Sequence, residues 1–499
     1  MLAGAAAMSL FAAVALVEVG PEAGVAIALV PLTAILAVLL VGRGRVVLYA
    51  AVFALPLSGI GLFYLPAVPL GGTKLFFQDL IVGIALGAWA FASLLGRRGD
   101  RAPKVPRTPV IGWPFVLFGA AITIAVLRGH YAYGSSFLGQ GFRLIFYAGI
   151  VVALVGLTVG GLYRLLLGVF YTGTIVTMAW AVYYIATGTS QTDQVSLSTG
   201  GTRILSISTS HYCAGTLFLA LLSLRLQPGG GARLLHLAMA ALGLFGVVLG
   251  FGRAVFAATA LVCLLLLVFS RPVRIALASV VPLALPFLAL LAIFIPRVAP
   301  DAVDAFVQRV TASPTNNDTN VNFRVAANEA VFAQIREQPL IGVGFGRNSE
   351  IVFDYNIGNG VTVADSTVIP QDPHNGYVYL WATGGLAALA PFVLMLGAFA
   401  GDAIRRYRSN HDPTARLLVL WSSCSLFVWL VNAGAGSTFS VPTDLMAVWA
   451  LLVTTSVVPY GGAIDVAGDT SRQTGWSKAA PAGGPGRREK LPRHTSWPS

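Results

Sequence analysis

The chain has 499 residues, of which 56% are hydrophobic and only 10% are charged, and its mean hydropathy is +0.77. This composition excludes an ordinary soluble globular protein and is typical of a protein embedded in a lipid bilayer. The formal net charge of +12 implies no nucleic-acid partner, because basic residues near the ends of apolar segments serve to orient membrane helices.

Apolar segments of about 18 to 25 residues recur along the chain, and each is long enough to cross a bilayer as a helix. They predict an all-α polytopic membrane protein with about fourteen transmembrane helices, in the range of roughly 12 to 14. The expected helices lie near residues 1–19, 22–41, 46–67, 75–95, 111–127, 141–160, 165–187, 209–226, 233–250, 253–270, 273–296, 376–400, 414–433 and 441–459. The first segment has no basic stretch before it, so we expect a retained helix rather than a cleaved signal peptide.

Basic residues gather in one set of the loops between these helices, and this set is assigned to the cytoplasmic side. Its members are Arg43, Arg45, Arg97, Arg98, Arg101, Lys104, Arg107, Arg164, Arg225, Arg233, Arg271, Arg274, Arg405, Arg406, Arg408 and Arg416. We therefore expect a multi-pass protein of the cytoplasmic (inner) membrane with both termini in the cytoplasm.

Four regions follow from this orientation. The chain is divided into N-terminal transmembrane helices over 1–296, a large extracytoplasmic loop over 297–375, C-terminal transmembrane helices over 376–459, and a tail over 460–499. The tail is basic and rich in Pro and Gly, which predicts a disordered segment that serves topology or contacts anionic membrane lipids.

A second set of basic residues falls on the outer side, where orientation alone disfavours them. Lys74, Arg128, Arg143, Arg203 and Arg253 lie in or beside short loops, and Arg297, Arg309, Arg324, Arg336 and Arg347 lie in the long loop, which obeys the charge rule less strictly. Arginines at helix ends commonly extend to lipid headgroups, and this explanation is expected to hold for about half of the outer set. The others would need an anionic ligand.

The long loop contains a predicted helix of its own over 320–338, which Pro339 ends. Arg324, Asn328 and Val331 fall on one face of that helix, so a guanidinium and an amide lie side by side. The glycine-rich stretch from Gly342 to Gly346 follows. No Lys-Ser/Thr pair comes after it, so we interpret it as a turn packed against helices and not as a phosphate-binding loop.

The loop closes on Asp372-Pro373-His374-Asn375-Gly376-Tyr377, directly before apolar sequence resumes. The unperturbed pKa of a histidine, about 6.5, suits it to exchange protons near neutral pH. In the alternative interpretation His374 caps the start of the next helix and has no chemical role. The carboxylates of the loop form no Asp-x-Asp pair, so we expect neither a metal site nor a cofactor.

Three stretches of this loop together resemble the O-antigen ligase/polymerase family of integral-membrane glycosyltransferases. They are Asn322-Phe323-Arg324, the run PLIGVGFG from Pro339 to Gly346, and Pro373-His374-Asn375 with Tyr377 and Leu380. Arg203 in the run GGTR and Arg253 in the run FGRA also resemble arginines of the family. The sequence departs from the family pattern at two places. Gly252 stands where family members often have Ser, and Trp381-Ala382-Thr383-Gly384 lacks the acidic residue that family members often have before that glycine.

The resemblance implies a GT-C-type membrane fold and an inverting, metal-independent glycosyltransferase. Such an enzyme would move a glycan from a polyprenyl pyrophosphate carrier to an acceptor at the outer face of the membrane. The acceptor would be a growing polysaccharide or a surface lipid or polymer, so polymerase and ligase activities both stay open. His374 would act on the proton of the acceptor hydroxyl, and the pyrophosphate would be bound by Arg203, Arg253 and Arg324. Supporting roles would fall to Asp372, Asn375, Tyr377 and Asn328.

Two other classes of function remain open. A secondary transporter or a lipid-linked glycan flippase would also have many helices, but its polar site would lie near the midplane between related halves. This chain instead concentrates polar residues outside and shows no internal repeat. A structural scaffold is the third possibility, and it predicts that replacing His374 alone is harmless.

Overall fold

The structure is a computed structural model that describes most of the chain between its two ends. The described residues are 45–54, 68–70, 73–95, 106, 108–134, 138–187, 205–226, 230–250, 252–269, 274–275, 278, 319–356, 362–369 and 374–460. The helices expected over 1–19 and 22–41, nearly all of the one over 273–296, and the tail after residue 460 lie outside these residues. The proposed boundaries of the four regions therefore stay predictions.

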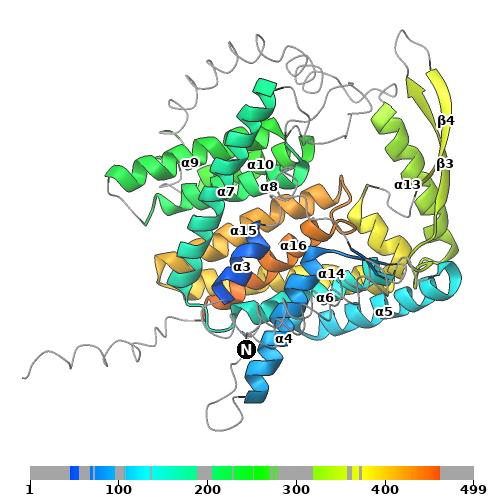
Figure 1. Ribbon diagram of the computed structural model, residues 1–499, viewed down its shortest axis with the longest axis horizontal. Coiled ribbons are helices and arrows are strands. Elements are labelled where there is room, and N and C mark those ends of the chain that lie inside the picture. The colour runs from blue at the N-terminus through cyan, green and yellow to red at the C-terminus, as the bar shows by residue number, and fades with distance from the viewer. Residues whose placement is uncertain are drawn as a thin grey trace, which may run out of the picture. The chain divides into compact units, whose positions relative to one another are not determined.

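The described residues are mainly helical (Figure 1). The α-helices are α3 (Arg45–Ala54), α4 (Phe77–Leu95), α5 (Trp113–Tyr133), α6 (Leu138–Phe146), α7 (Val159–Thr187), α8 (Ile207–Ser223), α9 (Gly230–Leu249), α10 (Arg253–Phe269), α13 (Thr319–Glu337), α14 (Gly376–Ser409), α15 (Pro413–Ala433) and α16 (Pro442–Thr454). Short 3₁₀ segments are η5 (Pro109–Ile111), η7 (Tyr147–Leu154) and η8 (Thr455–Val457).

Among the described residues, 5 helices are long and apolar enough to cross a membrane. They are α5, α9, α14, α15 and the part of α7 over Val159–Tyr183. Helix α5 leaves large apolar side chains uncovered by protein, with Trp113 64% and Val116 67% exposed. A face of this kind requires an apolar surrounding, which a bilayer supplies. The structure thus supports an integral membrane protein, while the expected count of about fourteen helices and the GT-C fold stay predictions.

The segment expected as one helix over 141–160 has a different structure. It consists of the short helix α6 followed by the 3₁₀ segment η7, whose residues are almost all buried between α4 and α16. A continuous apolar run does not distinguish a buried 3₁₀ segment from an α-helix, so the sequence pattern merged the two. The expected helix over 165–187 begins earlier, at Val159.

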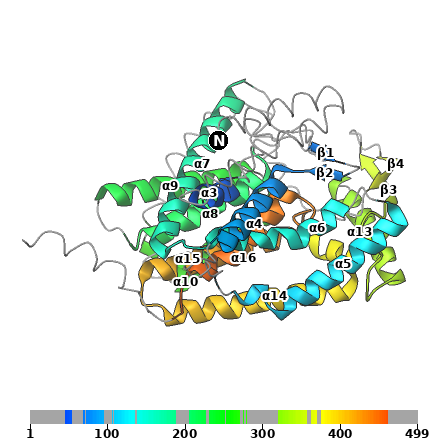
Figure 2. The same ribbon diagram turned by 60° about the horizontal axis from the view of Figure 1, so that its bottom comes forward.

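Helices α14 and α15 form an antiparallel hairpin that sets the two ends of the helical bundle. Helix α14 is broken at Gly385, whose φ of 68° is non-helical, and continues to Ser409. Asp412 then caps α15, because its Oδ1 accepts a hydrogen bond of 2.9 Å from the Thr414 backbone N–H. At the far end of α15, the loop over 434–441 returns to the start of α14, where the Tyr377 hydroxyl donates to the Leu430 carbonyl at 2.9 Å. Helix α5 runs alongside α14 (Figure 2).

Two antiparallel strand pairs accompany the helices, and the all-α expectation did not include them. Strands β1 (Val68–Leu70) and β2 (Thr73–Leu75) form the first pair, and β3 (Ser349–Asn356) and β4 (Thr362–Ile369) form the second. In the second pair Ser349 lies opposite Ile369. Helix α13 packs on β3, as Figure 1 shows, so the described part of the loop expected over 297–375 is an ordered unit of one helix and one hairpin.

Candidate functional site

Four helices begin close together at the end of the bundle that holds His374. The Ser208 hydroxyl in the first turn of α8 donates to Asp444 Oδ1 in the first turn of α16, at 2.6 Å. Phe439, just before α16, contacts Gly376 at the start of α14, where an added Cβ would lie 2.6 Å from the ring. Gly250, just before α10, lies against Ser210 of α8, whose side chain an added Cβ would overlap. Because each helix N-terminus carries a partial positive charge, this convergence favours an anion.

His374 lies at this convergence in a constrained backbone conformation. Its φ is 51°, which among the described residues makes it the one non-glycine residue with positive φ. Its Nδ1 lies 2.7 Å from Ser437 Oγ, in the loop between α15 and α16. On its other side, the ring centroid is 5.6 Å from that of Phe323 on α13. Segments far apart in sequence therefore hold the imidazole between them.

Asn375 and Tyr377 make structural contacts at the start of α14. Asn375 Oδ1 accepts hydrogen bonds from the backbone N–H groups of Tyr377 and Val378, at 3.1 and 3.2 Å, so Asn375 is the N-cap of α14. The Tyr377 ring packs edge-on against Phe439, with ring centroids 5.6 Å apart. Together these contacts fix where α14 begins and hence where His374 lies.

Helix α13 carries the expected Arg324 and places the adjacent residue, Phe323, against His374. Its predicted bounds, 320–338, are confirmed to within one residue at each end. Ala327 packs against Ile351 of β3, and Val331 packs against Ala382 of α14. With α13 packed in this way, the Phe323 ring contacts the His374 ring. Arg324 follows Phe323 directly in the sequence.

Arg324 and Asn328 lie one turn apart on α13 and are both half-buried. The Arg324 Nε atom is buried. Asn328 Oδ1 is also buried and has no hydrogen-bond partner among the described residues. A buried amide oxygen without a partner is unfavourable unless water or a ligand binds it, so this face of α13 is suited to contact a polar ligand.

The glycine-rich run after α13 docks into the break of α14. The backbone N–H groups of Val343 and Gly344 donate to the carbonyls of Ala382 and Thr383, at 2.8 and 3.0 Å. Gly342 has a φ of +67°, and an added Cβ there would lie 2.3 Å from the Thr383 carbonyl oxygen. The broken helix at Gly385 frees these carbonyls, so the loop and the break satisfy each other. The expectation of a turn packed against helices is confirmed.

The same run also docks on α5. Gly129 of α5 approaches the Phe345 backbone so closely that an added Cβ would lie 2.2 Å from its carbonyl oxygen. The Arg128 guanidinium donates to the carbonyls of Ile341 and Gly342. Arg128, one of the outer arginines, thus contacts backbone of the outer loop.

Two further outer arginines are neutralised by carboxylates. Arg143 on α6 pairs with Asp79 on α4 at 2.8 Å, and both side chains are buried. Arg347 pairs with Glu337 at the surface, and the hydrogen bond from Arg347 lowers the pKa of Glu337 below its usual value. The charges of Arg143 and Arg347 are therefore accounted for by ion pairs within the protein.

Arg253 differs from these paired arginines. It is the first residue of α10, it is exposed, and it has no ion-pair partner among the described residues. Its helix begins beside α8, at the convergence of helix N-termini. Arg203 and Asp372, the other two expected site residues, lie outside the described residues.

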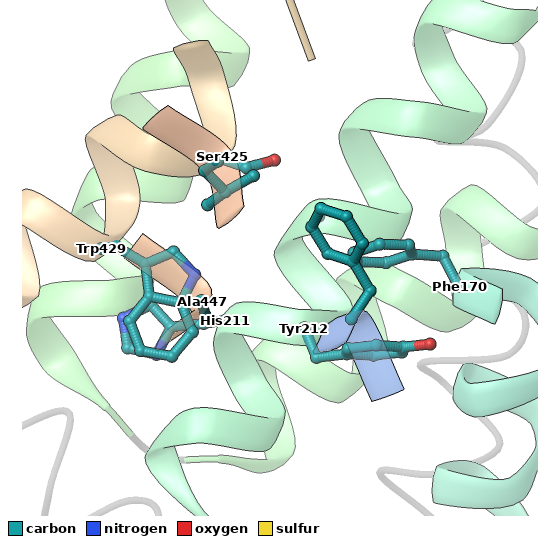
Figure 3. Close-up of a pocket in the computed structure, with 9 residues that line it drawn as sticks. Phe170, His211, Tyr212, Ser425, Trp429 and Ala447 are labelled. Atoms are coloured by element: carbon teal, nitrogen blue, oxygen red, sulfur yellow. The ribbon is translucent and has the colours of Figure 1, made fainter. Parts of the chain in front are cut away.

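A second histidine at this end of the bundle is interior and packed. His211 on α8 stacks on Trp429 of α15 with ring centroids 3.9 Å apart, beside a cavity of about 20 Å³ (Figure 3). His211 Nε2 and Ser425 Oγ are buried and have no partner among the described residues. A cavity of this size holds about one water molecule, so His211 has room for a bridging water and not for a glycan.

Sequence reasoning missed Ser437, the residue that contacts His374. It stands in the run GAGSTFS after a predicted helix, where nothing separates it from an ordinary loop serine. Within the described residues, no group of three or more His, Cys, Asp or Glu side chains gathers as metal ligands would. The expectation of a metal-free site stays a prediction.

The arrangement combines a proton acceptor with an anion-binding surface. An imidazole held at Nδ1 presents Nε2 for proton transfer. The helix N-termini at this end of the bundle, and Arg253 as the first residue of α10, are suited to the oxygens of a phosphate group. The site is therefore chemically suited to activating a hydroxyl beside a phosphorylated leaving group.

Comparison with protein families gives a match over residues 238–393 to the O-antigen ligase family model. No curated protein matches the chain. The matched segment runs from α9 into α14 and contains Arg253, Arg324, the glycine-rich run and His374. Over these residues, about a third of the chain, the protein is similar to the O-antigen ligase family.

Proposed function

We propose that this protein is an inverting, metal-independent glycosyltransferase that joins a polyprenyl pyrophosphate-linked glycan to an acceptor at the outer face of the cytoplasmic membrane. The acceptor is a growing polysaccharide or a surface lipid or polymer. The O-antigen ligase match supports glycan transfer of this type, and the apolar helices support a membrane location.

One observation carries the proposal: His374 is held at Nδ1 by Ser437, at 2.7 Å, where the helix N-termini converge. When the Nδ1 proton is donated to Ser437 Oγ, the lone pair of the ring is on Nε2, the nitrogen that then accepts a proton. The positive φ of His374 adds support, because strained backbone of this kind concentrates at functional sites.

In the proposed reaction, His374 Nε2 takes the proton from the acceptor hydroxyl. The hydroxyl oxygen then forms a bond to the anomeric carbon as the bond from that carbon to the pyrophosphate oxygen breaks. Displacement from the opposite face inverts the anomeric configuration, and the leaving pyrophosphate keeps the bonding electrons. A positioned general base of this kind contributes about 10²- to 10⁴-fold to a rate.

The leaving group gains negative charge during this step, so groups that bind it more tightly as the bond breaks accelerate transfer. In the proposal Arg324 and Arg253 hold the pyrophosphate, together with Arg203. Arginine suits this task because its planar guanidinium binds two phosphate oxygens at once and stays charged in a low-dielectric setting. Asn328, one turn from Arg324, would hydrogen-bond the same ligand.

The proposal is tested in cells that lack the protein and express either the wild type or His374→Ala at matched membrane abundance. Surface polysaccharide and lipid-linked intermediates are measured together. If the protein is a transferase, cells that express His374→Ala should accumulate lipid-linked glycan to the same extent as cells that lack the protein. Accumulation of single units indicates a polymerase, and accumulation of long polymer indicates a ligase.

A wild-type profile from His374→Ala would overturn the catalytic assignment and favour a scaffold. Intermediates trapped on the cytoplasmic side in the deletion would instead indicate a flippase, because the donor would never reach the outer face.

A further inference from the structure

A second polar cavity lies at the opposite end of the bundle from His374. It has a volume of about 260 Å³ and is formed where α8 ends, α14 ends and α15 begins. Helix α15 separates it from the Ser437 loop by 21 residues, which is about 30 Å of helix. The cavity is therefore independent of the site around His374.

The cavity is rich in positive charge that no carboxylate of the described residues pairs with. Arg225, His411 and Arg416 line it, together with Tyr407. Neither arginine forms an ion pair with a carboxylate among the described residues. The nearest acid in sequence, Asp412, accepts a hydrogen bond from the Thr414 backbone as the cap of α15. The net charge of the lining thus favours an anion.

Arg416 is held in position for such a ligand. Its Nε donates to the Asn410 carbonyl at 2.6 Å, and its guanidinium carbon lies 5.6 Å from the centre of the Tyr407 ring. The terminal guanidinium nitrogens have no partner among the described residues. Holding Nε fixed leaves the two-pronged end available, which is the part that binds phosphate oxygens bidentately.

Arg406 on α14, the residue before Tyr407, is by contrast paired within the protein. It pairs with Asp402 at 2.8 Å, donates to the Val458 carbonyl, and lies over the Tyr460 ring. It is 3% exposed. The protein therefore neutralises one arginine at this end of the bundle completely and leaves Arg225 and Arg416 facing a shared cavity.

The rest of the lining is apolar. Leu222, Leu226, Leu417, Leu420 and Pro413 complete the wall. A free inorganic anion gains nothing from leucine side chains, whereas the glycerol and upper acyl chain of a phospholipid bury apolar surface against them. Cationic pockets between helices at the end of a membrane bundle are suited to lipid headgroups.

We propose that this cavity binds the phosphate of an anionic phospholipid through Arg225 and Arg416. The headgroup phosphate accepts from both guanidinium groups, and the leucines contact the hydrocarbon below it. A bound lipid would link the ends of α8, α14 and α15, so it would stabilise the folded protein against thermal unfolding.

The test uses the purified full-length protein in detergent, depleted of lipid and titrated with phosphatidylglycerol, phosphatidylcholine or sodium phosphate. The unfolding temperature is the readout, so the result does not depend on transfer activity. Phosphatidylglycerol is expected to raise the unfolding temperature in a saturable way. Phosphatidylcholine and sodium phosphate at equal concentration are expected to raise it little.

The variants are Arg225→Gln, Arg416→Gln and the double variant, with Arg408→Gln as the matched control. Arg408 is an exposed arginine in the last turn of α14 that does not line the cavity. We expect the double variant to need about tenfold more phosphatidylglycerol for half of the effect, which corresponds to the loss of about 1.4 kcal/mol. The Arg225 side chain makes no hydrogen bond or ion pair among the described residues, so Arg225→Gln tests the site even if Arg416→Gln fails to fold.

Three results would overturn the proposal. An equal effect of phosphatidylcholine would indicate nonspecific lipid stabilisation. An equal effect of sodium phosphate would indicate a site for free anions. A response of Arg225→Gln indistinguishable from that of Arg408→Gln would show that the cavity does not bind the lipid.

Discussion

Ser437 Oγ lies 2.7 Å from His374 Nδ1, across 63 residues of sequence. The contact fixes which ring nitrogen faces away from the loop, and it holds a histidine whose backbone adopts the left-handed conformation. A conformation of this kind costs on the order of 1–3 kcal/mol and persists only where surrounding structure enforces it. The structure enforces it here through Ser437 on one side and Phe323 on the other.

Replacing Ser437 is expected to slow glycan transfer without removing the base. Ser437→Ala removes this hydrogen bond to Nδ1, so the orientation and tautomer of the ring are less tightly fixed. A hydrogen bond to a group that becomes charged is worth about 1.5–3 kcal/mol, which predicts a fall in kcat of roughly 10- to 100-fold. The measurement is kcat and its pH profile for purified protein with a lipid-linked donor. Ser437→Thr keeps the hydroxyl and should retain most of the activity.

Ser423→Ala is the control for this experiment, because the Ser423 hydroxyl donates only to the Val419 carbonyl of its own helix. It should leave kcat unchanged. Equal activity of Ser437→Ala and Ser423→Ala, with identical pH profiles, would show that the contact to His374 has no part in the reaction.

Arg324 should be sensitive even to a change that keeps its charge. Arg324→Lys loses the planar fork that binds two phosphate oxygens, and Arg324→Gln loses the charge as well. We predict a fall in kcat/KM for the donor of about tenfold for Lys and about 100-fold for Gln, by the energy of charge-assisted hydrogen bonds. Arg336→Gln, an exposed arginine near the end of the same helix, is the control. If Arg324→Gln matches Arg336→Gln, Arg324 does not bind the leaving group.

The docking of the glycine-rich run predicts a sharp difference between two glycines. Gly342→Ala combines a φ of +67° with a Cβ 2.3 Å from the Thr383 carbonyl oxygen, so it should destabilise the protein by about 1–3 kcal/mol. Gly397→Ala on α14 meets no atom within 4 Å and should be neutral or slightly stabilising. Thermal unfolding in detergent measures both. Equal unfolding temperatures would mean that the run does not dock as the structure has it.

The buried pair of Arg143 and Asp79 should matter far more than the exposed pair of Arg347 and Glu337. Asp79→Ala leaves the Arg143 charge buried without its partner, which costs about 3–5 kcal/mol. Glu337→Gln breaks a surface pair and should change little. The unfolding temperature is again the readout.

The double variant Asp79→Leu/Arg143→Met separates the two contributions to this loss. Replacing both charges by apolar side chains removes the stranded charge, so the double variant should recover part of the stability lost in Asp79→Ala. No recovery would mean that the loss comes from packing and not from the uncompensated arginine.

Sequence patterns predicted elements best where a local signal marked their ends. The helix over 320–338 was predicted closely because Pro339 cannot continue a helix. The β3–β4 hairpin was missed, although Ile351, Val352 and Phe353 are of the β-branched and aromatic types that favour strands, because the run SEIVFDYN does not alternate between apolar and polar residues. In η7 the apolar run carried no mark of its 3₁₀ geometry.

The site was predictable only in part, because its contacts join distant segments. The motifs singled out Phe323, Arg324 and His374, and the structure brings Phe323 and His374 into ring contact. Ser437 gave no signal in sequence, because a loop serine acquires a role only through the fold. The pairing of Arg143 with Asp79 was hidden for the same reason, since the partners are 64 residues apart.

The most direct test of the account is the rate of glycan transfer by purified protein in proteoliposomes, given a lipid-linked donor and an acceptor. The account predicts that His374→Ala lowers this rate by about 10²- to 10⁴-fold, while the unfolding temperature stays that of the wild type. His130→Ala, at an exposed histidine in the last turn of α5, should transfer at the wild-type rate. Transfer by His374→Ala at an undiminished rate would contradict the account.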